Sequence, residues 1–182
     1  EKKNLKTELE KLENQHFEIP IIINGQDYTT GNLGKCIKPH DHQHELAIYY
    51  KADMDEVNLA INSCLDAWKI WSSTPLNERI KIFRKAAELL AGPWRDTINA
   101  ATMLSQSKNV FQAEVDSACE LIDFFNFNAE YAENIYNEQN LISPEDNKNY
   151  LEYRPLEGFV FAITPFNFTS IAANLPCAPA LM

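Results

Sequence analysis

The sequence has few glycines and few basic residues. Only 5 glycines occur in 182 residues, and none forms a G-x-G-x-x-G or P-loop pattern, so a Gly-rich loop that cradles phosphate is excluded. The 16 lysines and arginines stand against 26 aspartates and glutamates, which gives a net charge of −10. Phosphate binding needs clustered basic residues, so we exclude a nucleic-acid partner.

Long hydrophobic runs are also absent. No stretch approaches the roughly twenty apolar residues that cross a bilayer, and "EKKNLKTELEKLENQ" at the N-terminus lacks the apolar segment of a secretory signal. We therefore expect no membrane partner. The sequence opens with Glu1 rather than Met, and "PCAPALM" breaks off inside an apolar helical pattern. These ends indicate a fragment of a longer protein.

The four cysteines show no pairing pattern. Cys36, Cys64, Cys119 and Cys177 have neither C-x-x-C nor zinc-site spacing, which indicates a reducing compartment. We expect the cytoplasm, or the mitochondrial matrix if the source is eukaryotic. Cys177 invites a role as a nucleophile, but no His or acid lies near it in the sequence. We interpret it as a buried structural thiol.

The hydrophobic pattern predicts strands first and helices afterwards. Residues 17–24, "FEIPIIIN", are typical of a strand, and Asn24-Gly25 favours a tight hairpin turn because both residues tolerate positive φ. A second strand pair is expected in "KCIKPH" and "ELAIYYKA". Residues 1–16 predict an amphipathic helix or a frayed arm. Further helices are expected from Asp53 to about Trp71, from Thr74-Pro75 to Gly92-Pro93, from Trp94 to Leu104 and from Val110 to Tyr136.

After a polar loop the pattern returns to a strand. The stretch "FVFAIT", residues 159–164, is continuously apolar, as expected for a strand covered on both faces in a helix-flanked parallel sheet. A helix of small residues is expected next. This order of helix, strand and helix predicts the α/β class, with helices packed on an open, mostly parallel sheet.

Asn167 lies between two phenylalanines where this expected strand turns into the helix. In open α/β sheets, ligands gather at the C-terminal ends of the strands, where the next helix presents free N–H groups. The side-chain NH₂ of Asn167 could donate to an oxygen that gains negative charge in a reaction. The alternative is a helix N-cap, a role that Thr169 or Ser170 could share. Spacing alone favours the cap.

The stretch "RPLEGFVFAITPFNFTSIAANLPCAPALM" resembles the aldehyde dehydrogenase superfamily, in which a strand delivers a Pro-aromatic-Asn-Phe motif at the cofactor cleft. More narrowly, it resembles the branch that oxidises L-glutamate γ-semialdehyde, the open form of 1-pyrroline-5-carboxylate. That branch has Phe where most relatives have Trp, and it carries a helix much like "QAEVDSACELIDFFNFNAEYA". The resemblance implies that residues 17–182 are the incomplete, N-terminal part of an NAD-binding domain, preceded by a helix or arm at residues 1–16.

The resemblance implies roles for particular residues. Asn167 matches the catalytic donor to the oxyanion, and Glu120 matches a helix acid near the ammonium group of the substrate. Phe166 also borders the aldehyde pocket. The residues that match the strand end lining the NAD site are Ile163, Thr164, Pro165 and Phe166. The family's cysteine nucleophile, its glutamate general base and its ribose-binding lysine and glutamate are expected beyond residue 182. The fragment alone is therefore expected to be inactive.

Two other patterns have competing interpretations. Alternate histidines could ligate zinc from one face of a strand, and they are His40, His42 and His44. The family has an ordinary surface turn at this point, so we expect no metal site. A run of aromatic residues could stack on a ligand, and its members are Phe124, Phe125, Phe127 and Tyr131. Helical spacing favours core packing for this run.

We therefore expect the full-length protein to oxidise L-glutamate γ-semialdehyde to L-glutamate with NAD, in proline degradation. We expect a homo-oligomer that acts on a small-molecule substrate. Two alternatives stay open. One is an aldehyde dehydrogenase for another aldehyde, and the other is a non-catalytic helical interaction module.

Overall fold

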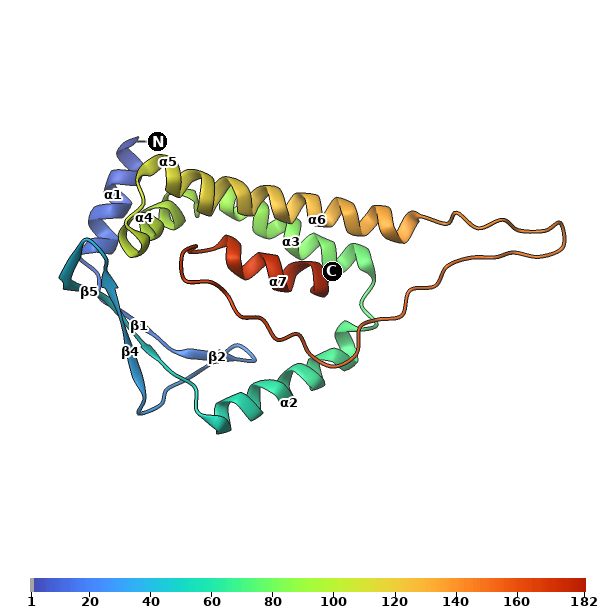
Figure 1. The fold of residues 1–182 in the computed structure, drawn as a ribbon, viewed down its shortest axis with the longest axis horizontal. Helices are drawn as coiled ribbons and strands as arrows, with labels where there is room; N and C mark the ends of the chain where they lie inside the picture. Colours follow the sequence, from blue (N-terminus) through green and yellow to red (C-terminus); the bar gives the residue numbers. More distant parts are fainter. Residues whose placement is uncertain (1) are drawn as a thin grey trace.

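The computed structural model describes residues 2–182, apart from the side chains of residues 173–176. In chain order its elements are α1 (Lys2–Glu13), β1 (Phe17–Ile19), β2 (Ile21–Ile23), β3 (Gln26–Tyr28), β4 (Leu33–Lys38), β5 (Asp41–Tyr50), α2 (Met54–Trp71), α3 (Leu76–Ala91), α4 (Arg95–Gln106), α5 (Val110–Ala113), the π-helix η1 (Glu114–Cys119), α6 (Glu120–Asn137) and α7 (Ile171–Leu181). Figure 1 shows the strands at one end of the molecule and the long helix α6 running away from them. The mixture of helices with a sheet that contains a parallel pair confirms the predicted α/β class.

Local chemistry explains where the first strands break. Residues 17–24 form two strands rather than the single predicted one, because Pro20 has no N–H to donate to a strand ladder. β1 pairs in parallel with β5, whereas β2 pairs antiparallel with β3. The turn predicted at Asn24-Gly25 is confirmed, since the two residues have φ of 51° and 72°, as a two-residue hairpin turn of this kind requires.

The three-stranded sheet has the order β1-β5-β4, with β4 antiparallel to β5. Gly34 on β4 lies against the ring of Tyr49 on β5, where an added Cβ atom would collide with the ring. Helices α1 and α4 pack together beside this sheet. Their shared core consists of Leu12, Leu46, Ala100 and Leu104. The N-terminal residues thus form the helix rather than the frayed arm.

Helix α2 begins where the sequence predicts a helix, directly after Asp53. Asp53 is the N-cap, and its backbone N–H donates to the Glu56 carboxylate at 2.9 Å. The apolar stripe of α2 is not buried by the residues that the structure describes, and Ile70 stays 75% exposed. Two indole N–H groups nevertheless tie α2 to the C-terminal part of the chain. Trp68 donates to the carbonyl of Leu156 at 2.5 Å, and Trp71 donates to that of Leu181 at 3.0 Å.

The single helix predicted over residues 110–136 is a series of three segments, α5, η1 and α6. Helix α6 packs against α3 and α7, and the ring of Phe125 lies 5.9 Å from that of Phe83. Core packing is therefore confirmed for Phe125, and Phe124 beside it is half-buried. The prediction of core packing is wrong for Phe127 and Tyr131. Both are exposed, because their face of α6 meets no described element, and their rings stack on each other.

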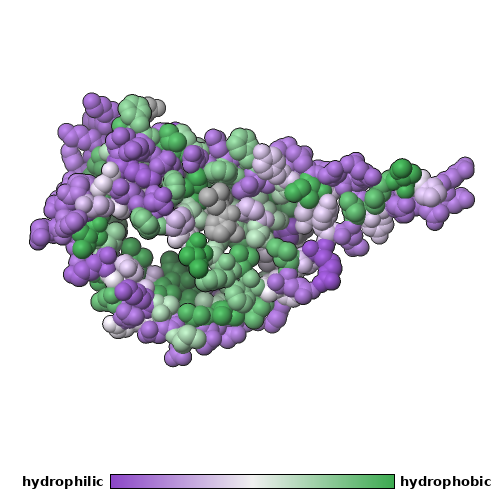
Figure 2. Space-filling model, in the orientation of Figure 1, coloured by the Kyte–Doolittle hydropathy of each residue, from purple (hydrophilic) through white to green (hydrophobic). Residues whose placement is uncertain are grey.

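Residues 138–170 contain no helix or strand. Figure 1 shows them projecting beyond α6 as a long loop and returning past α2 to α7. The strand predicted at residues 159–164 is not formed, because no described strand pairs with it, and Phe161 and Ile163 are 77% and 79% exposed. Figure 2 shows hydrophobic residues gathered over the middle of this face, whereas the tip of the projecting loop is mostly hydrophilic. Part of the apolar surface is thus uncovered within residues 2–182.

Candidate active site

The Pro-Phe-Asn-Phe motif occupies the bend between the extended segment and α7. Helix α7 begins at Ile171, and its N-cap position is Ser170 rather than Asn167. The helix-cap alternative for Asn167 is therefore wrong, since the residue lies three positions before the cap. The Ser170 hydroxyl does not cap α7 either. It is buried and donates to the backbone carbonyl of Ser117 in η1 at 2.8 Å, which ties the end of the motif to the π-helix.

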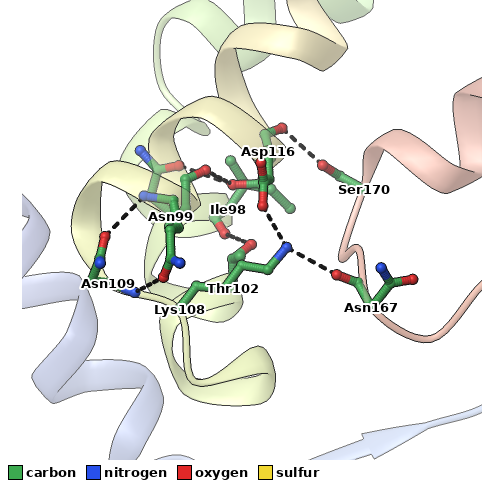
Figure 3. A network of polar contacts seen from close by, with 11 residues as sticks. Ile98, Asn99, Thr102, Lys108, Asn109, Asp116, Asn167 and Ser170 are labelled. Carbon is green, nitrogen blue, oxygen red and sulfur yellow. Dashed lines mark hydrogen bonds and ion pairs between the residues drawn. The ribbon is translucent and has the colours of Figure 1, made fainter.

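A lysine holds the motif at its centre. The Nζ of Lys108 donates to the backbone carbonyl of Asn167 at 2.9 Å and to the Oδ2 of Asp116 at 2.6 Å. It also lies 4.4 Å from the centre of the Phe168 ring, within the range of a cation–π contact. Figure 3 shows Lys108 reaching from the bend between two helices to both partners. The motif is thus fastened to the helical layer by its backbone.

The backbone at Lys108 is fixed by a helix terminus on each side. Ser107 is the C-cap of α4 and has a φ of 54°, so the chain reverses there in the left-handed conformation. Asn109 is the N-cap of α5, where its side chain accepts from the N–H of Gln112 at 3.0 Å and the Gln112 side chain accepts from the N–H of Asn109. Lys108 is the one residue between these two caps. The position and direction of its Cα–Cβ bond are therefore fixed by the two helix ends.

The π-helix η1 carries its own polar network. The Glu114 carboxylate accepts hydrogen bonds from Arg95 and Asn99 of α4, and the hydroxyl of Ser117 donates to Asn99 at 3.0 Å. Burial alone would raise the pKa of the Glu114 carboxyl, but the hydrogen bonds from Arg95 and Asn99 outweigh it and lower that pKa. Burial and the neighbouring Glu114 charge raise the pKa of the Cys119 thiol, which disfavours the thiolate form.

The predicted site residues of the extended segment are all open to solvent. Phe166 is 90% exposed, and Ile163, Thr164, Pro165 and Asn167 are exposed as well. The side-chain amide of Asn167 makes no hydrogen bond to any residue that the structure describes, whereas its backbone is held. This arrangement leaves both N–H groups of the amide free to donate to a ligand.

Glu120 begins α6, one helical turn after Asp116, and is half-buried. Its side chain makes no hydrogen bond or ion pair within the described part of the chain, so its role in substrate binding stays a prediction. Cys177 lies on α7 and is half-buried rather than fully buried. No His, Asp or Glu within the described residues is hydrogen-bonded to it, and the structure gives it no partner that would activate the thiol.

The three histidines do not form a cluster. His40 lies in the turn before β5 and its Nδ1 is 2.6 Å from the Ser107 hydroxyl, while His42 and His44 follow on β5. Within residues 2–182 the structure brings together no group of three His, Cys, Asp or Glu side chains that could hold a metal ion. None of the helices in this range combines the length and hydrophobicity needed to cross a membrane.

Sequence reasoning missed Lys108 and Asp116, which fasten the motif, and it considered Ser170 only as a helix cap. Lys108 offered one usable signal. It is the single residue between "SQS", which ends one helix, and the "NVFQ" capping box, which begins the next. A residue held between two helix ends has a fixed backbone, so its side chain is a candidate for a specific contact. Asp116 offered no such signal, because its placement depends on the π-helix.

The fold and the motif agree with the comparison to protein families. A family model described as "Aldehyde dehydrogenase family" matches residues 28–182, and the chain belongs to this family. It is 45% identical over 183 residues to the delta-1-pyrroline-5-carboxylate dehydrogenase of Agaricus bisporus, covering all of this chain and 34% of that protein. It is 43% identical over 182 residues to the mitochondrial enzyme of the same name from Mus musculus, covering 100% of this chain and 32% of that protein.

A solved structure supports the same family. The NAD-bound delta-pyrroline-5-carboxylate dehydrogenase of Mycobacterium tuberculosis superimposes with a TM-score of 0.95 at 46% identity, covering 100% of this chain and 34% of that one. The chain thus spans about a third of the length of the relatives it matches.

Proposed function

We propose that this chain is the N-terminal part of an NAD-dependent L-glutamate γ-semialdehyde dehydrogenase of proline degradation. One observation carries the proposal. Lys108 anchors the backbone of Asn167, while the side-chain amide of Asn167 is exposed and has no hydrogen-bond partner in the described structure. The names of the relatives supply the substrate and the cofactor. Residues 17–182 then belong to an incomplete NAD-binding domain, and α1 in the preceding segment packs on its helix α4.

Residues 163–166 suit the planar, partly apolar rings of a dinucleotide cofactor. Ile163 and Phe166 present apolar side chains to solvent at 79% and 90% exposure, with Thr164 and Pro165 between them. Apolar side chains with a few placed polar groups are the usual lining of cofactor sites. We propose that these four residues hold NAD, which when bound supplies the hydride acceptor. In the same site Phe166 excludes water from the aldehyde.

Asn167 would stabilise negative charge on the aldehyde oxygen. An amide N–H is a neutral donor that does not titrate. It can therefore point at the oxygen before and after the negative charge develops, without gaining or losing a proton. We propose that Glu120 binds the ammonium group of the substrate through a charge-assisted hydrogen bond. The nucleophilic cysteine and the general base would come from outside these residues. Cys119 contacts Arg95 and Glu114, but its pKa is raised by burial and by the Glu114 charge, and no His, Asp or Glu within the described residues is hydrogen-bonded to Cys177.

The whole protein is proposed to act as a homo-oligomer in the cytoplasm, or in the mitochondrial matrix of a eukaryote. The mouse relative is named as mitochondrial, which supports the second location for a eukaryotic source. This chain alone is proposed to be inactive.

Substrate choice tests the proposal. The full-length protein would be assayed for NADH formation with L-glutamate γ-semialdehyde, with glutarate semialdehyde and with propanal. Glutarate semialdehyde is a matched substrate, since it differs only in lacking the amino group. A charged hydrogen bond to that group should favour the amino substrate in kcat/KM by about 10- to 150-fold.

Each other outcome selects one of the alternatives. Highest kcat/KM with propanal or glutarate semialdehyde would indicate a dehydrogenase for another aldehyde. Absence of turnover with every aldehyde, together with absence of NAD binding, would favour an interaction module.

A further inference from the structure

Lys108 joins three separate parts of the molecule. Its ammonium group contacts the Asp116 carboxylate of η1, the Asn167 carbonyl and the Phe168 ring, while its backbone belongs to the bend between α4 and α5. Only 17% of the side chain is exposed, and Asp116 is 26% exposed. This pair is much less solvated than the surface pair Lys85–Glu88, which is 65% and 67% exposed. A lysine that gives up its hydration at this point must have its charge balanced, and Asp116 balances it.

The contacts of Lys108 determine the orientation of one peptide plane. The carbonyl of Asn167 and the N–H of Phe168 belong to the same planar unit. Lys108 holds the carbonyl by a hydrogen bond and the following ring by a cation–π contact. The backbone angles of Asn167 restrict its side-chain rotamers. The side chain itself has no partner within residues 2–182, so the backbone is what aims the amide.

The π-helix holds both ends of the motif. Asp116 acts on Asn167 through Lys108, and the carbonyl of Ser117 accepts the hydroxyl of Ser170 at 2.8 Å. Single π turns inside helices are uncommon and occur frequently at functional sites. We propose that Lys108 and Asp116 are positioning residues that aim the Asn167 amide at the developing oxyanion. This inference rests on the proposed function, in which Asn167 is the oxyanion donor.

A double-mutant cycle in the full-length protein tests the inference. Lys108→Met removes the charge and its donors while keeping a long, unbranched side chain. It should lower kcat about 10- to 100-fold, as expected when a reacting group is misplaced, with KM for NAD nearly unchanged. In an Asn167→Ala background the same Lys108→Met change should cost less than about twofold, because the group that Lys108 positions is already gone.

The cycle also separates positioning from a direct effect of the lysine charge on the oxyanion. A direct effect would persist in the Asn167→Ala background, so an undiminished loss there would overturn the inference. Lys108→Arg keeps the charge and should retain more activity than Lys108→Met. Lys85→Met, which breaks an exposed pair with Glu88 at 2.9 Å, is the matched control and should leave kcat at the wild-type value.

Hydrogen exchange gives a readout that does not depend on activity. In full-length Lys108→Met, the backbone amides of Phe168 and Thr169 should exchange faster than in the wild type. Their rates should increase by a larger factor than those of amides in α3, because the unpaired Asp116 also lowers the stability of the whole fold. Unchanged exchange at these amides overturns the inference whatever the kinetics. Faster exchange in a protein whose wild type oxidises no aldehyde would uphold the anchoring by Lys108 and reject the proposed function.

Discussion

Replacing Asn167 separates a catalytic donor from a structural residue. In the structure its side chain is exposed, caps no helix and has no hydrogen-bond partner within the described residues. Asn167→Ala should therefore change the free energy of unfolding by less than about 0.5 kcal/mol, as for an ordinary surface position. Loss of one oxyanion donor typically costs about 100- to 1000-fold in kcat, or about 3 to 4 kcal/mol of transition-state stabilisation. A large kinetic effect without a stability effect is the expected signature.

The assay needs the full-length protein and two measurements. NADH formation at saturating NAD and L-glutamate γ-semialdehyde gives kcat, and thermal unfolding gives the stability change. Asn167→Asp sharpens the comparison, because Asp has nearly the same shape but carries a negative charge that repels an oxyanion. Asn147→Ala, at an exposed position in the projecting loop, is the matched control and should leave kcat unchanged. Wild-type turnover in Asn167→Asp would refute the assignment of Asn167 as the donor.

Three further predictions concern other carboxylates. Glu120→Ala in the full-length protein should raise KM for L-glutamate γ-semialdehyde by about 10-fold or more, with little effect on propanal; equal effects on both aldehydes would leave Glu120 with a structural role. Glu13→Ala should lower the free energy of unfolding by about 1 to 3 kcal/mol, because it leaves the buried ammonium of Lys38 unpaired. Lys38→Met should lower the free energy of unfolding less, because the charge that it leaves unpaired is the more exposed Glu13 carboxylate. Equal decreases for the two variants in denaturant unfolding would contradict this. The pKa of Glu114 is lowered from its ordinary value of 4.5, so its contribution to stability should be complete above that pH and be lost as the pH falls through the lowered pKa. Melting temperatures of Glu114→Gln should accordingly vary less than those of the wild type in this acidic range, and parallel curves would refute the link.

Local backbone chemistry made parts of the fold predictable. The positive φ of Asn24 and Gly25 is a property of these residue types, and the hairpin turn forms where the sequence predicts it. The N-cap at Asp53 and the helix end at Gly92 are also set by nearby residues. The position of Asn167 at a bend before a helix was predictable for the same reason. That Asn167 is not the helix cap could be seen only once the start of α7 at Ile171 was known.

The fastening of the motif could not be predicted in this way. Asp116 contacts Lys108 because η1 winds more widely than an α-helix, and nothing in "EVDSAC" distinguishes a π turn from an α turn. The 3.6-residue period that predicts one helix over residues 110–136 averages over the six residues that depart from it. The contact between Lys108 and Asn167 spans 59 positions in the sequence, so no local pattern records it.

The extended segment at residues 159–164 shows what an apolar pattern does encode. A continuous apolar run predicts burial on both faces, and a strand is the usual way for a short run to achieve it. A strand, however, is defined by its hydrogen-bonded neighbours, and Phe161 and Ile163 have none among the described strands and stay exposed. The pattern therefore describes a surface that is suited to contact and not the contact itself. Asn167 lies three residues after this segment, and its anchoring in the described structure comes from Lys108 and η1 on the helical side alone. Loss of Lys108 should accordingly loosen the motif more than loss of any side chain of the extended segment, a ranking that hydrogen exchange can test at Phe168 in Lys108→Met and Phe161→Ala.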